Sequence, residues 1–321
     1  MKKAQRLVML AAVLALASSA HAQSESSKAP PAVKSATTVG EVVVKGQKEE
    51  GLAGNIPESV WKKIPDIVWK DAPARARFSH TGTLSRWIDP VCPGTIGLTH
   101  EYALFVSRRI NEVARQFVKV RRKCGSGINV VVAFTGEPQK MLTDVLHNQS
   151  GLFGYHYTQE DQQLATSAGP IQAWYVTATN DDIDDPYKDA KAYRASGRYK
   201  ANTVSSIRFV LVVVDGDLIE GQPIGRTADH VAALVLSNTA FRKGCSPLPS
   251  ILDSLNPACP QSSSIQSLTD YDWAILKGLY STDPQEREAA ARGSLTSKVV
   301  TVLHQEAAGA GGRGALEADP K

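Results

Sequence analysis

The chain has 321 residues, of which 42% are hydrophobic and 21% are charged, and its formal net charge at pH 7 is +4. This composition is typical of a globular protein, and the small net charge gives no reason to expect a nucleic acid or an acidic surface as partner. After the N-terminal apolar stretch, no segment approaches the roughly 20 apolar residues of a transmembrane helix, so none is expected in the mature chain.

Residues 1–22 have the pattern of a secretory signal peptide. Lys2, Lys3 and Arg6 precede the apolar stretch LVMLAAVLALA, and the Ala-His-Ala sequence that ends at Ala22 is typical of a cleavage site. Cleavage after Ala22 removes three positive charges and leaves a formal net charge of +1. We therefore expect an exported protein, located in the periplasm of a Gram-negative cell or secreted.

Residues 23–56 are rich in Ser, Ala, Lys, Pro and Gly, and this composition predicts a disordered linker. Within it, the sequence GEVVVKGQ at residues 40–47 resembles the TonB box of outer-membrane TonB-dependent receptors. An extended segment of this kind can add as a strand to the sheet edge of a partner. Two interpretations stay open: a segment that binds the TonB system, and a linker with some β propensity.

Four cysteines in an exported chain predict two disulfide bonds. Three pairings are possible. We favour Cys92 with Cys124 and Cys245 with Cys259, because each of these pairs closes one compact segment. No cysteine has another cysteine or a histidine at metal-ligand spacing, so no metal site is expected at these residues.

A folded domain is expected over residues 57–305. Its first elements are a short strand in PVCPGTIGL, residues 90–98, and a helix over residues 99–120. The apolar stripe of this helix comprises Tyr102, Val106, Ile110, Val113 and Phe117. The basic cluster KVRRKC, residues 119–124, falls at the expected end of the helix, where cations complement the helix dipole. An anion-binding site is the alternative interpretation.

The following residues predict three more strands and a helix. GINVVVAF at 127–134, PIQAWYVTATN at 170–180 and SIRFVLVVVDG at 206–216 have the β-branched and apolar runs of buried strands. EPQKMLTDVLHNQ at 137–149 predicts a helix with Pro138 in its first turn.

After these strands the pattern is helical. IGRTADHVAALVLSN at 224–238 predicts one helix, Thr269 and Asp272 predict a capping box at the start of another, and residues 284–306 predict a last one. Residues 306–321 are rich in Gly and Ala and are expected to be a disordered tail. The order of elements predicts an α+β fold with a mixed sheet and N-terminal helices, followed by a helical C-terminal half.

Two short motifs in this order resemble the zincin metalloproteases. PSIL at 249–252 is similar to a turn that follows the zinc helix of zincins, and SLTDYDWAILKGLY at 267–280 is similar to a downstream LTxxDxxxLxxLY signature. The resemblance implies that residues 224–238 correspond to the zinc helix, and that a cleft lies between this helix and the edge strand of the sheet. The chain also resembles an uncharacterised group of exported bacterial proteins that keep this scaffold without the metal site.

The zinc motif HExxH places two imidazoles one turn apart and a glutamate between them. The alignment of ADHVAALVL with HExxHxLGL places Ala228 and Ala232 at the two histidines, Asp229 at the glutamate and Asn238 at a third ligand. Methyl groups cannot bind zinc, so we expect no metal, no other cofactor and no metal-dependent peptidase activity. A register that makes His230 the first ligand leaves Leu234 as its partner.

The resemblance also implies which residues line the cleft. The candidate binding residues are Tyr155, His156, Trp174, Tyr175 and Asp229. Trp174 and Tyr175 are neighbours on an expected strand and point to opposite faces, so covering the core is the alternative role for them.

Three hypotheses for function follow. The first is an exported, non-catalytic binding or accessory protein that holds a peptide or a cell-envelope component. The second is a hydrolase with a rearranged site formed by Asp229, His230 and His156. The third is a periplasmic protein associated with the TonB system.

Overall fold

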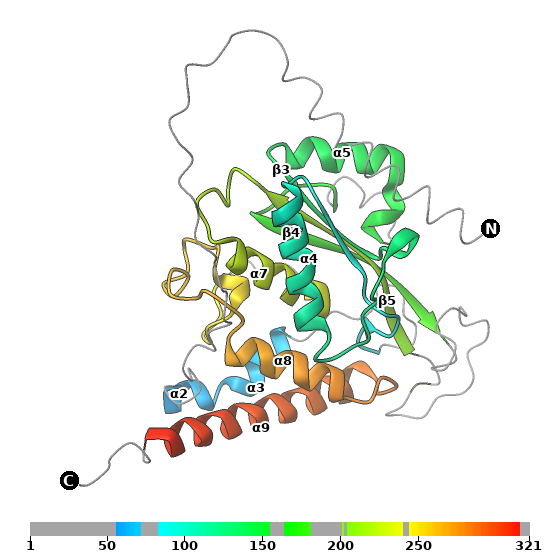
Figure 1. Ribbon diagram of the computed structural model, residues 1–321. Coiled ribbons are helices and arrows are strands. Elements are labelled where there is room, and N and C mark those ends of the chain that lie inside the picture. The colour runs from blue at the N-terminus through cyan, green and yellow to red at the C-terminus, as the bar shows by residue number, and fades with distance from the viewer. Residues whose placement is uncertain are drawn as a thin grey trace.

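The computed structural model describes residues 56–71, 83–154, 164–180, 201, 204–239 and 244–314 (Figure 1). The expected signal peptide and the TonB-box-like segment lie outside these residues, as do Tyr155 and His156. The described residues form a mixed sheet with helices on both faces and a further group of helices at one end (Figure 1). The expected α+β class is confirmed at this level.

The sheet has five described strands: β1 (Arg86–Trp87), β2 (Pro93–Ile96), β3 (Val130–Thr135), β4 (Ile171–Asn180) and β5 (Val204–Asp215). On one side, the long strand β5 pairs in parallel first with β1 and then with β3. On its other side it pairs along its length with β4, which is antiparallel. Strand β2 extends the sheet in parallel beyond β3. Among the described strands, β4 is therefore the antiparallel edge of an otherwise parallel sheet.

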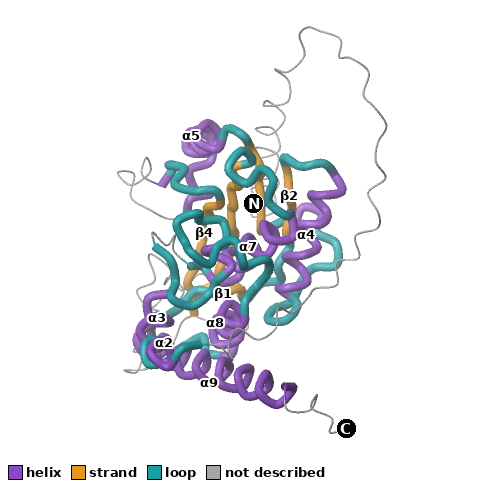
Figure 2. Tube along the Cα trace, turned by 90° about the vertical axis from the view of Figure 1, so that its left-hand side faces the viewer, coloured by secondary structure: helices purple, strands orange, loops and turns teal. Residues whose placement is uncertain are grey.

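Strand β3 and the second half of β5, residues 209–214, are apolar runs because both of their faces are covered. Helices α4 (His100–Ala114) and α7 (Ile224–Ser237) pack on one face. Helix α5 (Pro138–Gln149) and the 3-10 turn η3 (Ser150–Phe153) pack on the other. Figure 2 shows α5 and α4 on opposite sides of the strands. Alternate side chains of β3 consequently enter two different cores.

The remaining helices form a separate apolar cluster at one end of the sheet (Figures 1 and 2). They are α2 (Glu58–Trp61), α3 (Ile64–Asp71), α8 (Asp270–Ser281) and α9 (Glu288–Gly314). Helices α8 and α9 approach closely at Gly278, where an added Cβ would lie 2.7 Å from Cδ1 of Leu295. Further along α9, the rings of Trp61 and His304 stack with their centroids 4.2 Å apart.

Several expectations are confirmed and some are wrong. The disulfides pair Cys92 with Cys124 and Cys245 with Cys259, as expected. Helix α4 ends at Ala114 instead of residue 120, because the chain beyond it forms a β-bridge with the segment before β2. Tyr102 is not part of its buried stripe and is 51% exposed.

The C-terminal boundary also differs from the expectation. Helix α9 continues to Gly314, past residue 306, where a disordered tail was expected to begin. The Gly and Ala residues that suggested disorder therefore continue a helix whose earlier turns are anchored in the apolar cluster. Among the residues that the structure describes, no helix combines the length and apolar character needed to cross a bilayer.

Candidate functional site

Helix α7 is buried along most of its length. Every residue from Arg226 to Ser237 is buried, and the helix contacts α4, the sheet, α8 and the segment that follows it. Because successive residues of an α-helix point about 100° apart, each face of α7 meets a different neighbour. The candidate residues on this helix are therefore divided between different environments.

Asp229 lies on the face of α7 that meets α4. Its carboxylate accepts two hydrogen bonds from the Arg109 guanidinium, from Nε to Oδ1 at 2.5 Å and from Nη2 to Oδ2 at 3.1 Å. The Leu268 amide donates a third, to Oδ2 at 3.3 Å. The hydrogen bond with Asp229 is the main reason that the pKa of Arg109 is raised. Asp229 thus joins three segments, and both of its oxygens already accept hydrogen bonds.

The pair of Arg109 and Asp229 is expected to stabilise the fold. The Asp229 side chain is 3% exposed and that of Arg109 is 27% exposed. Asp229→Ala removes the acceptor of three donors and should lower the free energy of unfolding by about 3 kcal/mol. A double-mutant cycle with Arg109→Met, measured by urea unfolding, should give a coupling energy of about 2 kcal/mol.

The surface pair of Lys140 and Glu137 is a matched control for this cycle. Nζ of Lys140 lies 3.2 Å from Oε2 of Glu137, but both side chains are more than 60% exposed. The same cycle at this pair should give a coupling energy of about 0.5 kcal/mol or less. Equal coupling energies at the two pairs would contradict the assigned role of Asp229.

The alanines aligned with zinc ligands also belong to the α4 side of α7. Ala228 and Ala232 are fully buried, and they share a helix face with Gly225, where an added Cβ would lie 4.0 Å from the Phe105 ring of α4. Asn238, aligned with the third ligand, is a buried left-handed C-cap with a φ of 47°. The three positions that align with zinc ligands therefore lie at the contact between α7 and α4 and at the end of α7.

A different face of α7 lines a pocket of about 810 Å³. His230 and Leu234, one turn apart, form its α7 wall. The other walls are Ile67, Lys70 and Asp71 of α3, the residues 168–171 that lead into β4, residues 239, 244–247, 252–253 and 255–257 after α7, and Arg292 of α9. The register with His230 and Leu234 is therefore the one that faces a cavity.

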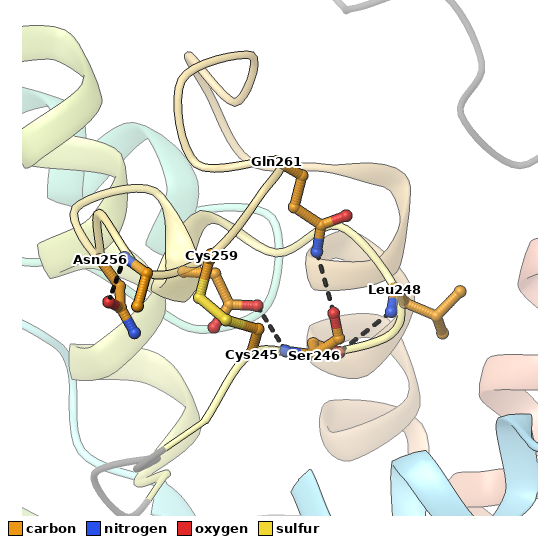
Figure 3. The surroundings of a disulfide bond; sticks show 8 residues. Cys245, Ser246, Leu248, Asn256, Cys259 and Gln261 are labelled. Carbon is orange, nitrogen blue, oxygen red and sulfur yellow. Dashed lines mark hydrogen bonds between the residues drawn. A yellow bond between two sulfur atoms is a disulfide. The ribbon is translucent and has the colours of Figure 1, made fainter.

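The pocket wall after α7 is a loop closed by the disulfide of Cys245 and Cys259 (Figure 3). Just after this loop, the Gln261 amide donates back to the Ser246 carbonyl at 2.9 Å, as Figure 3 shows. Arg226 of α7 donates to the carbonyl oxygens of Ser254 and Ser262. These contacts hold the loop against the helix, so the wall is fixed before any ligand arrives.

His230 is the polar group that α7 presents at the pocket. It is 6% exposed, and its Nδ1 atom is buried without a hydrogen-bond partner. The pKa of His230 is lowered to about 4, mainly by burial and also by the Arg226 charge, while a backbone hydrogen bond with Ile251 opposes the shift. The imidazole is therefore neutral at pH 7, and it has an unused hydrogen-bonding atom.

This depressed pKa predicts a loss of stability in mild acid. The unfolded chain takes up a proton at His230 near pH 6.5, whereas the folded chain resists it until about pH 4. As pH falls through this window the unfolded state binds more protons, so the free energy of unfolding should decrease by about 3 kcal/mol. In the His230→Gln variant this decrease in unfolding free energy between pH 6.5 and pH 4 should be absent when urea unfolding is measured at several pH values. Parallel pH profiles for the two proteins would show that His230 titrates normally.

Trp174 and Tyr175 do not line the pocket. The Trp174 indole lies in the core beneath α5, where it donates to the Leu164 carbonyl at 2.9 Å and meets the Phe153 ring edge-on. The Tyr175 hydroxyl donates to the Leu234 carbonyl of α7 at 2.7 Å, and burial raises its pKa. The two side chains thus pack into cores on opposite faces of β4, and neither lines this pocket.

No family model, curated protein or solved structure matches this chain. Of the candidate residues that the structure describes, His230 lines this pocket, whereas Asp229, Trp174 and Tyr175 do not. Within the described ranges, no group of three or more His, Cys, Asp or Glu side chains is placed to hold a metal ion.

The pocket residues of α3 were not predicted from the sequence. Lys70 is exposed beside the pocket, and Ile67 forms part of its apolar wall. Helix α3 is only eight residues long, and its apolar residues alone do not indicate which partner they cover. The signal that could have identified the loop wall is the close spacing of Cys245 and Cys259.

Proposed function

We propose that this chain is an exported, non-catalytic binding or accessory protein on a scaffold like that of the zincins, and that the pocket beside α7 holds a peptide or another cell-envelope component. The observation that carries the proposal is the position of the pocket. It lies between α7 and the residues that lead into the antiparallel edge strand β4. This is where the resemblance implies a cleft.

The side chains at the pocket favour binding over hydrolysis. His230 offers one neutral imidazole, and the next residue of α7 on this side is Leu234. Asp229 points about 100° away from His230 around the helix and accepts hydrogen bonds from Arg109 and Leu268. A catalytic pair of Asp229 and His230 would require both groups to face the same ligand. The rest of the lining mixes apolar residues with polar ones, among them Lys70, Asp71 and Asp253, and a few polar groups set among apolar residues are typical of a site that recognises a ligand.

Binding can be tested with a variant that fills the pocket. Gly244 lines the pocket, and a Cβ added there meets no atom within 4 Å, so Gly244→Trp can introduce a large side chain at the pocket wall. Fluorescence-labelled peptides and soluble peptidoglycan fragments serve as probes. The wild type should bind one of these classes, and Gly244→Trp should weaken that binding at least about tenfold, about 1.4 kcal/mol.

Gly151→Trp is the matched control. Gly151 is also exposed and free of neighbours within 4 Å, but it lies in η3 and does not line the pocket. It should bind the probe as the wild type does. Equal binding by all three proteins would place the site elsewhere.

The same samples distinguish binding from hydrolysis. Mass spectrometry of the peptides after incubation, with and without a chelator, should show intact probe in every case. Cleavage that His230→Ala abolishes would contradict the non-catalytic role and favour the hydrolase hypothesis.

A further inference from the structure

A dense group of cations follows helix α4. We call Arg115, Lys119, Arg121, Arg122 and Lys123 the basic segment; Arg121 is half-buried and the other four are exposed. In the described part of the chain, none of the five forms an ion pair with an acidic side chain. The small net charge of the whole protein conceals this local concentration of positive charge.

The helix dipole does not account for these residues. Helix α4 ends at Ala114, and Arg115 is its C-cap. The influence of a dipole is confined to the last turn of a helix. Arg121, Arg122 and Lys123 lie well beyond that turn, in a segment that is not helical. The dipole interpretation therefore covers Arg115 alone.

The backbone of the basic segment is held by buried residues of the domain. The Val91 amide donates to the Lys119 carbonyl at 2.9 Å, and the Arg121 amide donates to the Val91 carbonyl at 3.0 Å. Three residues later, Cys124 is joined to Cys92. Val91 and Cys92 are fully buried. The cations are thus displayed on an ordered backbone, which reduces the entropy lost when a partner binds.

The aromatic residue within the segment is already engaged. The Phe117 ring packs against Tyr280 and Trp273 of α8, with centroids 5.5 and 5.7 Å away. Recognition of single-stranded nucleic acid combines cations with aromatic rings on which bases stack, and this segment offers cations without such a ring. Its chemistry fits a surface of closely spaced negative charges, and the proposed export places the chain next to anionic envelope lipids.

We propose that the basic segment docks the protein on a bilayer surface rich in anionic phospholipid. The proposal depends on the proposed export but not on the pocket, because no residue of the basic segment lines the pocket. Each Lys or Arg near such a surface strengthens binding about fivefold. Docking through these residues would leave the pocket free to hold its ligand.

Vesicle co-sedimentation of the exported protein tests this docking. Vesicles of phosphatidylcholine with about one third phosphatidylglycerol should bind the protein, and vesicles of phosphatidylcholine alone should not. Raising the salt from about 0.1 M to about 1 M, which shortens the screening length from about 10 Å to about 3 Å, should release it. The double variant Arg122→Ser, Lys123→Ser should bind about 25-fold more weakly.

The matched control is Lys62→Ser, Lys63→Ser, which removes the same charge from two exposed lysines beside α2. It should bind vesicles as the wild type does, and so should Gly244→Trp. Equal binding to the two kinds of vesicle, or equal weakening by both double variants, would overturn the proposal. The proposal would also be overturned if inorganic phosphate, at the same concentration as the lipid phosphate, released the protein from the vesicles. Binding to duplex DNA that is tighter than binding to the vesicles and uses the same residues would overturn it as well.

Discussion

Replacing Asp272 by alanine is expected to cost about 4 kcal/mol of unfolding free energy or more, because its carboxylate is the acceptor for several buried donors. Oδ1 accepts from the Ser250 hydroxyl at 2.6 Å. Oδ2 accepts from the Ile251 amide at 2.8 Å and from the amide and hydroxyl of Thr269, each at 2.9 Å. These bonds oppose the effect of burial, which raises the pKa of Asp272.

The cost has two physical parts. Asp272 forms the capping box of α8 with Thr269, and loss of a cap costs about 1 kcal/mol. The same carboxylate fixes the turn at Ser250 and Ile251, whose donors would stay buried without acceptors after the substitution. Urea unfolding of the variant measures the sum of the two parts.

Asp270→Ala is the matched control within the same turn. Asp270 is the first residue of α8, and its Oδ2 is buried without a hydrogen-bond partner. The substitution loses a favourable interaction with the helix dipole, but it also removes a buried oxygen that has no hydrogen-bond partner. The net change in the free energy of unfolding should therefore be below about 1 kcal/mol. Similar losses for the two variants would show that Asp272 contributes only through the dipole.

Gly97→Ala should cost about 4 kcal/mol, for a reason that lies in the backbone. Gly97 follows β2 with a φ of +85°, and a Cβ there would lie 1.9 Å from the Phe134 carbonyl oxygen. Phe134 belongs to the central strand β3 and is paired with Val214 of β5. Since neither strand can move without disturbing the core, the clash cannot be relieved cheaply.

Gly221→Ala separates the clash from the strain of the backbone conformation. Gly221 has a φ of +76°, close to that of Gly97, but an added Cβ meets no atom within 4 Å. Only the left-handed strain remains there, about 1 kcal/mol. Thermal and urea unfolding of both variants should show a difference of about 3 kcal/mol. Equal losses of unfolding free energy in the two variants would mean that the Phe134 carbonyl moves to accommodate the added Cβ.

Local patterns were sufficient for most elements of the fold. The β-branched runs that became β3 and β5 predicted buried strands, because an apolar run of that length cannot stay exposed. The capping box of Thr269 and Asp272 was predicted correctly, since its partners are three residues apart in sequence. Helix α3 was missed, because its short apolar face is stabilised by α9, more than 200 residues later.

The sequence by itself determined the four longer strands, the main helices and the absence of imidazoles at Ala228 and Ala232, and it favoured the observed cysteine pairing among three possible ones. These properties depend on neighbouring residues or on side-chain chemistry. Only the tertiary structure decided which face of α7 meets a cavity, because that depends on where α3, β4 and the disulfide loop pack around it. The same packing engages Asp229 with Arg109 and leaves His230 at the pocket. Because residues on every side of α7 are buried, its sequence could not show which of its faces meets a cavity.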